Sequence, residues 1–174
     1  MAGAAWTSTP PLLTKPQKVR GGYPIKSGEI INQGDLVGLD TNGQVVAASK
    51  TGGSTVKAIG IAFFDDDNST AQAARTGVAN LTVKCGICQQ AGLKFSSAYA
   101  ATQVPSINKG LPVYLGDVAT GTVSNLTCAQ TTTDTDLVQE VGHVDADGLT
   151  LLLNVVLNND FAYQNAANST ARFV

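Results

Sequence analysis

Residues 25–46 constrain the fold more than any other part of the chain. Two β-rich apolar runs, 36–39 and 44–47, are joined by a turn that ends in Asn42-Gly43. Asn-Gly is the strongest short signal for a β-hairpin, because both residues tolerate positive φ. Glycines also bracket the short apolar segment just before this hairpin, which indicates sharp bends at both of its ends. The stretch predicts a chain built by folding short hairpins onto one another.

The pattern of this hairpin returns later in the chain. Residues 110–123 repeat the order of glycine, apolar pair, turn, glycine, polar residue and valine that residues 34–45 show. Further on, residues 141–144 stand in the place of residues 59–62. Recurring patterns of this kind are typical of duplicated supersecondary units. We therefore expect an all-β fold, with two similar strand-turn-strand units in one compact barrel.

The length of 174 residues fits one domain with a sizeable core. Four of the six prolines fall within or just after the first 22 residues, which favours an extended N-terminal arm. We expect this arm over residues 1–22, a β-rich core over 23–158 and a C-terminal tail over 159–174. One short helix is expected over 71–75. The apolar residues of 149–157 point to both faces of a strand, which predicts a strand that is covered on both faces.

Charge and hydropathy exclude two classes of partner. Only 14% of the residues are charged and the net charge is −2, so no basic cluster large enough to neutralise nucleic-acid phosphates is present. No run of about 18 apolar residues predicts a membrane span. The N-terminus has no basic region followed by an apolar one, which favours synthesis in the cytoplasm without export. We expect neither nucleic acid nor a membrane as a partner.

The cysteines and the single histidine are the first candidates for a metal site. Cys85 and Cys88 form a Cys-x-x-Cys motif, and with Cys128 and His143 they would supply four zinc ligands. Residues three apart on a strand point to opposite faces, however, and Cys128 and His143 do not form a second short-spaced pair. Small buried cysteines and a structural histidine are therefore the favoured interpretation. Three cysteines without a signal peptide also argue against a disulfide framework.

No other motif indicates catalysis or cofactor binding. The acidic run at 65–69 begins like a calcium loop, but Thr70 and Thr76 stand where that loop needs glycine and glutamate. The chain has neither a phosphate-binding Gly-x-x-x-x-Gly-Lys-Ser/Thr loop nor the dinucleotide-binding glycine motif. We expect no enzyme activity, no catalytic, cofactor or metal site, and no small-molecule substrate.

The N-terminal residues carry the chain's only tryptophan. Trp6 lies in the predicted arm with Leu12 and Leu13. An apolar side chain on an arm needs a surface to cover it. Two interpretations stay open with equal weight: the arm folds back onto its own domain, or it docks on a partner.

Several short glycine-based motifs, taken together, resemble the head-decoration, or capsid cement, proteins of tailed phages. The resemblance covers roughly residues 22–158. The opening segment, 25–36, is also similar to β-clip domains in general, including domains attached to enzymes, so the fold alone does not define the function. The motifs that carry the resemblance lie at 28–37, 43–45, 59–62, 110–114, 121–123 and 141–144.

The resemblance implies a small β-clip or β-tulip domain that forms a homotrimer on the outer surface of a virion capsid. Such a protein binds the major capsid protein and stabilises the shell by bridging adjacent subunits. Here the bridging arm would be residues 1–20, with Trp6, Leu12 and Leu13 as the capsid-binding anchors. An alternative is another virion component, such as a tail-tube or fibre-base protein. A metal-binding or enzymatic β-clip module is the third hypothesis.

Overall fold

The computed structural model describes residues 12–51, 56–63, 66–67, 84–95, 109–116, 126–127, 136–155 and 162–164. Every regular element in these ranges is a β-strand, so the all-β prediction is confirmed. The helix expected over 71–75 lies outside the described residues. The strands are β1 (Leu12–Gln17), β2 (Arg20–Pro24), β3 (Ile30–Ile31), β4 (Leu36–Leu39), β5 (Val45–Ala47), β6 (Gly60–Ala62), β7 (Asp66–Asp67), β8 (Lys84–Cys88), β9 (Gln90–Lys94), β10 (Pro112–Leu115), β11 (Leu126–Thr127), β12 (Leu137–Val144), β13 (Thr150–Asn154) and β14 (Ala162–Gln164).

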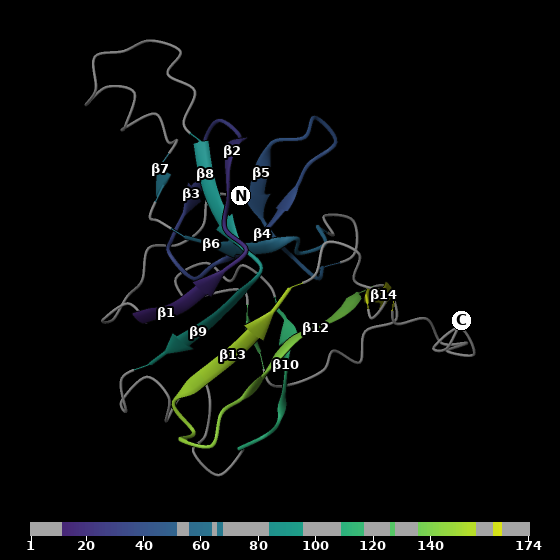
Figure 1. Cartoon of the computed structure of the whole chain (residues 1–174). Helices are drawn as coiled ribbons and strands as arrows, with labels where there is room; N and C mark the ends of the chain where they lie inside the picture. Colours follow the sequence, from purple (N-terminus) through teal and green to yellow (C-terminus); the bar gives the residue numbers. More distant parts are fainter. Residues whose placement is uncertain are drawn as a thin grey trace.

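The strands form two main antiparallel sheets, one above the other in Figure 1. The small sheet has five strands in the order β2-β8-β6-β4-β5. The large sheet has the order β1-β9-β13-β12-β10-β11, and β14 pairs with β12 beside this path. A further two-stranded pair, β3 and β7, contains Asp66 and Asp67 of the acidic run. The rest of this acidic run, for which the sequence argued against a calcium loop, lies outside the described residues.

The two sheets repeat one arrangement of strands. The first unit consists of β2, β4, β5, β6 and β8. In the small sheet these strands lie in the order β5-β4-β6-β8-β2. Strands β9 to β13, the second unit, lie in the order β11-β10-β12-β13-β9. Reading each unit in chain order, the first strand lies at one end, the third at the other, and the fourth and fifth between them. The two units therefore share one topology.

The register of the strands repeats as well. In the first unit Val37 pairs with Gly60, and in the second unit Val113 pairs with Gly142. One residue along each strand, the pairs are between Leu36 and Ile61, and between Pro112 and His143. The segments 59–62 and 141–144 thus occupy equivalent places. The returning strand of the second unit is β11, however, so the residues expected in that role, 121–123, lie outside the described part of the chain.

Equivalent glycines precede the second strand of each unit, β4 and β10. Gly34 has a φ of 91° and donates its N–H to the carbonyl oxygen of Ala62 at 2.9 Å. Gly110 has a φ of 76° and donates to the carbonyl oxygen of Val144 at 2.8 Å. A positive φ is favourable for glycine and strained for other residues. The duplicated glycine of the sequence pattern thus marks the same left-handed turn before the second strand of each unit.

The small sheet curves until its ends meet. Just after β2, Ile25 forms a parallel bridge to Val45 of β5, and Lys26 donates its N–H to the Val45 carbonyl at 3.0 Å. The first unit is therefore a small barrel. Its interior is a cluster of buried residues on one face of the small sheet: Ile25, Ile31, Val37, Val45, Ala62, Cys85 and Ile87.

The second and larger core lies between the two units. The opposite face of the small sheet contributes Leu36, Ile61 and Cys88, all fully buried. The inner face of the large sheet contributes residues of β9, β10, β12 and β13, including Leu93 and Leu151. Burial of apolar area is the main favourable term in folding, so this shared core holds the two units together.

Polar contacts also connect the units. The Gln139 amide, fully buried on β12, accepts from the N–H of Ala58 and donates to its carbonyl, both at 2.9 Å. Lys50 forms an ion pair with the buried Asp136 at 3.0 Å. The backbone carbonyl of Lys50 accepts a hydrogen bond from the N–H of Leu137 at 2.8 Å. These bonds fix the second unit against the loop that follows β5.

The N-terminal residues correct one prediction. Residues 12–22 were expected in an arm outside the core, but Leu13 of β1 pairs with Leu93, and Arg20 of β2 pairs with Ile87. Two features let a proline-rich segment form strands: β1 lies at the edge of its sheet, where a missing N–H is tolerated, and its register shifts between Thr14 and Gln17. Residues 1–11 lie outside the described part.

At the C-terminal end, β14 falls within the predicted tail of 159–174. Tyr163 on this strand pairs with Val138 of β12. This part of the tail therefore adds a strand to the large sheet. The rest of the tail lies outside the described residues.

Candidate functional site

The outer face of the large sheet is the main exposed surface built from regular strands. Leu151 and Leu153 are buried in the shared core, so Leu152 between them points outward, because alternate side chains of a strand point to opposite faces. It lies in one cross-strand row with Thr14, Gly92 and His143. Leu152 is 37% exposed. The central strand of the sheet was expected to be covered on both faces, and that expectation is wrong for this side chain.

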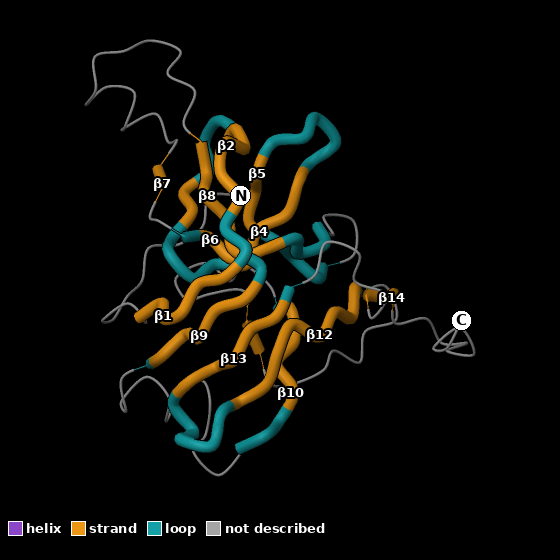
Figure 2. The backbone as a smooth tube through the Cα atoms, viewed as in Figure 1, coloured by secondary structure: helices purple, strands orange, loops and turns teal. Residues whose placement is uncertain are grey.

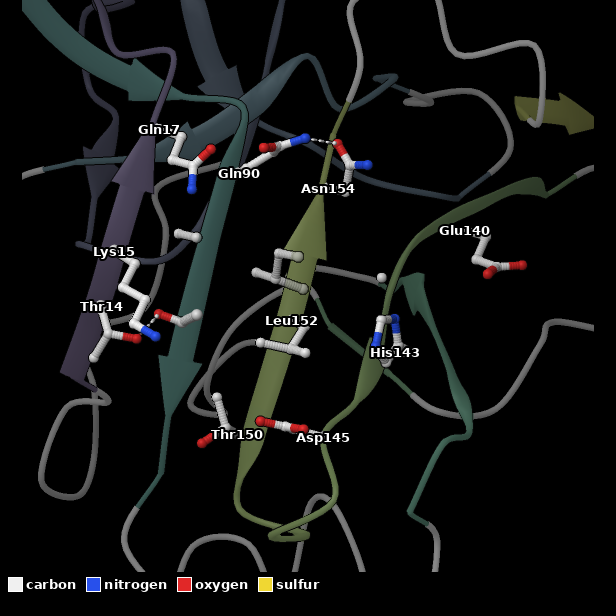
Figure 3. Close-up of a pocket in the computed structure, with 14 residues that line it drawn as sticks. Thr14, Lys15, Gln17, Gln90, Glu140, His143, Asp145, Thr150, Leu152 and Asn154 are labelled. Carbon is white, nitrogen blue, oxygen red and sulfur yellow. Dashed lines mark hydrogen bonds between the residues drawn. The ribbon is translucent and has the colours of Figure 1, made fainter.

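A shallow hollow of about 660 Å³ lies on this face. Its lining residues come from four neighbouring strands, and Figure 3 shows Leu152 near its centre. Those strands are β1, β9, β13 and β12, in that order across the sheet. The hollow is therefore a feature of the second unit and of the strand, β1, that is added to its edge.

One position in the central row of the hollow, Gly92, is glycine, and the Thr14 side chain lies over it. A Cβ atom on Gly92 would lie 2.5 Å from the Thr14 hydroxyl oxygen. That hydroxyl donates a hydrogen bond to the Gly92 carbonyl at 3.2 Å. Glycine at this position thus leaves room for the Thr14 side chain, because the nearest β1 backbone atom, the Thr14 carbonyl oxygen, would lie at an ordinary contact distance of 3.7 Å.

Polar and charged side chains surround Leu152. Lys15 lies on the β1 side, and Glu140 and Asp145 lie on the β12 side. At one end of the hollow the Gln90 amide donates to the Asn154 side-chain oxygen at 3.1 Å. Figure 3 shows the Asp145 carboxylate directed across the face towards β13. The surface therefore combines one central apolar group with a basic side and an acidic side, a pattern typical of a protein-binding surface.

The first unit shows what happens to the equivalent face when another protein layer covers it. The strand registers make Leu36, Ile61 and Cys88 the counterparts of Pro112, His143 and Leu152. All three first-unit residues are fully buried against the second unit. The backbone surface that forms an internal interface in one unit is thus presented to solvent in the other.

The candidate zinc ligands do not come together among the described residues. Cys85 belongs to the barrel core and Cys88 to the shared core, so the two thiols lie on opposite faces of β8, as the spacing predicted. His143 is exposed on the outer face of the large sheet. In the part of the chain that the structure describes, no three histidine, cysteine or acidic side chains gather to hold a metal, and Cys128 lies outside it.

The Cys88 thiol also has the wrong chemistry for a nucleophile. Burial removes water from the Cys88 thiol and raises its pKa to about 11. A thiol with this pKa stays protonated at neutral pH, whereas reactive cysteines act as thiolates. The prediction that Cys85 and Cys88 are small buried residues is confirmed.

The expected capsid-binding anchors divide into three cases. Leu12, the first residue of β1, is 62% exposed. Leu13 is half-buried and packs against the shared core. Trp6 lies outside the described residues. Leu12 does not line the hollow, so it marks a separate apolar point at the corner where the N-terminal residues join the sheet.

Sequence reasoning missed the hollow, although one signal for it was present. Gly92 and Gly142 interrupt apolar strands at positions level with Leu152 and Leu153 of β13. A glycine inside a strand often indicates a close approach of another chain segment. Pairing the strands was needed to see that both glycines lie next to the same central strand.

Among the described residues, no helix has the length and hydropathy to cross a membrane. Comparison with protein-family models and with curated proteins finds no match to the chain. The functional argument therefore uses the geometry of the chain and the motif resemblance already described.

Proposed function

We propose that the chain is a virion structural protein that decorates the outer surface of a phage capsid. In this role it binds the major capsid protein and stabilises the shell by bridging adjacent subunits. The resemblance of the glycine-based motifs to capsid cement proteins motivates this proposal. The observation that supports it best is the corner of the large sheet at Leu12.

At that corner the exposed side chain of Leu12 directly precedes residues that are packed and hydrogen-bonded in the sheet. Leu12 is exposed, while its neighbour Leu13 is fixed in the shared core and Thr14 is hydrogen-bonded to β9. The eleven preceding residues, with Trp6, continue from this point. Apolar groups on a pre-ordered support lose little conformational entropy on binding. We infer that residues 1–12 contact the shell, with Trp6 and Leu12 as the anchors.

The two-unit body suits the transmission of force between the subunits it bridges. The units share one core and are further connected through Gln139 and the Lys50–Asp136 ion pair. Many copies on one shell combine modest individual contacts into a large total stabilisation through avidity. No bond needs to be made or broken in this role.

Co-sedimentation with shells assembled from the major capsid protein of the same virus tests the proposal. We expect the wild-type chain to bind saturably and to raise the temperature at which the shells open. Leu12→Asp and Trp6→Ala should each weaken binding about tenfold or more, as expected for an apolar anchor. The matched control is Leu39→Asp, which changes an exposed leucine of the first unit.

Failure of the wild-type chain to bind intact shells would refute the decoration role. Binding that Leu12→Asp and Trp6→Ala leave unchanged would refute the assignment of the anchors. Incorporation into sixfold tail rings instead of shells would favour the tail-tube alternative.

A further inference from the structure

We propose that the hollow face of the large sheet binds the same face of a second copy of this chain. The two copies are related by a two-fold axis that runs parallel to the strands, between β9 and β13. Leu152 of each copy then lies in the hollow of the other, at the level of Gly92 and beside the Thr14 hydroxyl. This pairing is independent of the shell-binding role.

The strand order makes the face suitable for such a contact. The four strands that line the hollow are β1, β9, β13 and β12, so a line between β9 and β13 has two strands on each side. A two-fold axis along this line places β13 of one copy over β9 of the other, and β12 over β1. An isologous interface requires this kind of reciprocal match.

The central apolar residue and the glycine of the central row are at the same level. Leu152 and Gly92 are direct partners in the pairing of β13 with β9. Rotation about an axis parallel to the strands leaves the level along the strands unchanged. Leu152 of the partner subunit therefore meets Gly92 together with the Thr14 hydroxyl that lies over it. The contact is made twice, once in each direction.

The charges on the two sides of the hollow are also complementary under this rotation. Lys15 lies on β1, and Glu140 lies on β12 towards the same end of the hollow. Because β12 of one copy lies over β1 of the other, Glu140 of the partner subunit comes near Lys15. Opposite charges that meet in this way fix the register of an interface and disfavour other pairings.

The first unit provides an internal precedent. Its counterparts of His143 and Leu152, Ile61 and Cys88, are buried under the second unit. The same backbone surface therefore already supports close packing of protein in this chain. In the second unit it carries a polar residue, His143, and a half-covered leucine, a composition that suits a surface exposed in the monomer and covered in the dimer.

The size of the face predicts a reversible dimer. Four strands spaced about 4.8 Å apart give a contact only about 15–20 Å wide. A contact of this width buries less area than the roughly 800 Å² per partner of a standard stable interface. We expect a dissociation constant in the micromolar range, because small interfaces leave little surplus after the entropy of association.

Sedimentation velocity on the purified full chain, over concentrations of about 1–200 µM, tests the proposal. We expect a shift from monomer to dimer with concentration. Leu152→Asp should keep the chain monomeric throughout, since a carboxylate would enter an apolar contact. Leu39→Asp is the matched control, because Leu39 and Leu152 are both 37% exposed. It should dimerise like the wild type.

A charge exchange tests the two-fold geometry itself. Lys15→Glu and Glu140→Lys should each weaken dimerisation at least threefold, because each places like charges together. The double variant restores opposite charges and should regain most of the wild-type affinity. Restoration by the double variant is expected only if the two side chains meet across the interface.

Three results would overturn the inference. The first is a wild-type chain that stays monomeric at the highest concentration. The second is a trimer, the state that the motif resemblance implies, because an isologous face cannot close a threefold ring. The third is a dimer that neither Leu152→Asp nor the charge exchange affects. Shell binding by a monomeric or trimeric chain would leave the decoration role intact and reject only this face.

A control on the N-terminal residues tests whether residues 1–11 of the same chain occupy the hollow in place of a second copy. Trp6 is the only tryptophan, so its fluorescence reports its surroundings without interference. If the emission of the monomer shifts to longer wavelength on Leu152→Asp, residues 1–11 occupy the hollow and the dimer is rejected. Unchanged emission of the monomer is the result expected for the two-copy interface.

Discussion

The two units of the chain place their short and long connections at opposite positions. In the first unit, residues 40–44 make a tight turn between β4 and β5, while residues 63–83 separate β6 from β8. In the second unit, residues 116–125 separate β10 from β11, while residues 145–149 make the tight β12–β13 turn at the lower end of Figure 2. The shared strand order tolerates this exchange because connections lie at the surface. The two units therefore share their strand pairing but not the lengths of their connections.

The units differ further in how many of their faces are buried. The small sheet is buried on both faces, by the barrel core and by the shared core. The large sheet has the shared core on one face and the hollow on the other. The same topology therefore carries Ile61 where a face is covered and His143 where it is open. Burial, more than position in the fold, determines which residue type is present.

Exchanging this pair of equivalent residues should have the largest effect on stability. Ile61→His places an imidazole in the shared core, where Ile61 is 0% exposed. We expect a loss of about 3–5 kcal/mol, from lost apolar packing and a buried polar group. The reverse exchange, His143→Ile, should change the free energy of unfolding by less than about 0.5 kcal/mol. Urea denaturation monitored by circular dichroism measures both.

Equal effects of the two substitutions would contradict the difference in burial between the units. Ile61→Val serves as a size control and should cost about 1 kcal/mol. A loss for Ile61→His no larger than that of Ile61→Val would mean that this side of the small sheet is accessible to water.

The next effect concerns the contact that joins the units. Gln139→Leu keeps the approximate volume but removes both hydrogen bonds to Ala58, whose N–H and carbonyl are buried. We expect a loss of about 2–4 kcal/mol, since unsatisfied buried polar groups keep their full desolvation penalty. Gln90→Leu removes an exposed hydrogen bond between the Gln90 and Asn154 side chains, and it should change stability by about 0.5 kcal/mol or less. Similar losses for both variants would show that the Gln139 bonds do not hold the units together.

The equivalent glycines provide a sharper comparison. Gly34→Ala and Gly110→Ala both force alanine into a positive φ, which costs about 1–2 kcal/mol. A Cβ on Gly34 would also lie 2.7 Å from Leu93 Cδ1, whereas a Cβ on Gly110 meets nothing within 4 Å. Overpacking should add about 1 kcal/mol or more to the Gly34 variant alone. Thermal unfolding of the pair measures this difference, and equal melting temperatures would contradict the assigned packing.

The sequence predicted part of the local structure well. Asn42-Gly43 indicated the β4–β5 hairpin, in which Gly43 has a φ of 73°. Gly34 and Gly110 indicated the equivalent turns before β4 and β10, because a left-handed turn has a direct signature in the residue type. The proline-rich start was misread. Pro16 excludes a central strand but is compatible with an edge strand such as β1, and only the pairing with β9 distinguishes an arm from an edge.

The candidate site was less predictable for a physical reason. The run 149–157 showed apolar residues on both faces, and nothing local distinguishes a leucine beneath another sheet from one beside a hollow. Leu152 lies beside Gly92, which is far away in sequence and next to it in the sheet. Cross-strand neighbours of this kind become visible only when the register is known.

The tight turn found only in the second unit should give the smallest effect, seen at acid pH. Asp147 accepts hydrogen bonds from the N–H groups of Leu149 and Thr150 and from the Thr150 hydroxyl. These bonds favour the charged carboxylate, with the Leu149 N–H as the largest cause and the Thr150 hydroxyl next, so the pKa of Asp147 lies below its ordinary value of 3.8.

A lowered carboxyl pKa in the folded state adds stability above the unfolded value, and this stability is lost as the pH falls through the folded value. Asp147→Asn should therefore reduce the fall in melting temperature between about pH 5 and pH 2. Thr150→Val removes one of the donors and should give a smaller change in the same direction. An acid profile identical to wild type in both variants would mean that the turn carries no pH-dependent stability, and the two units would then differ in their connections without differing in their response to acid.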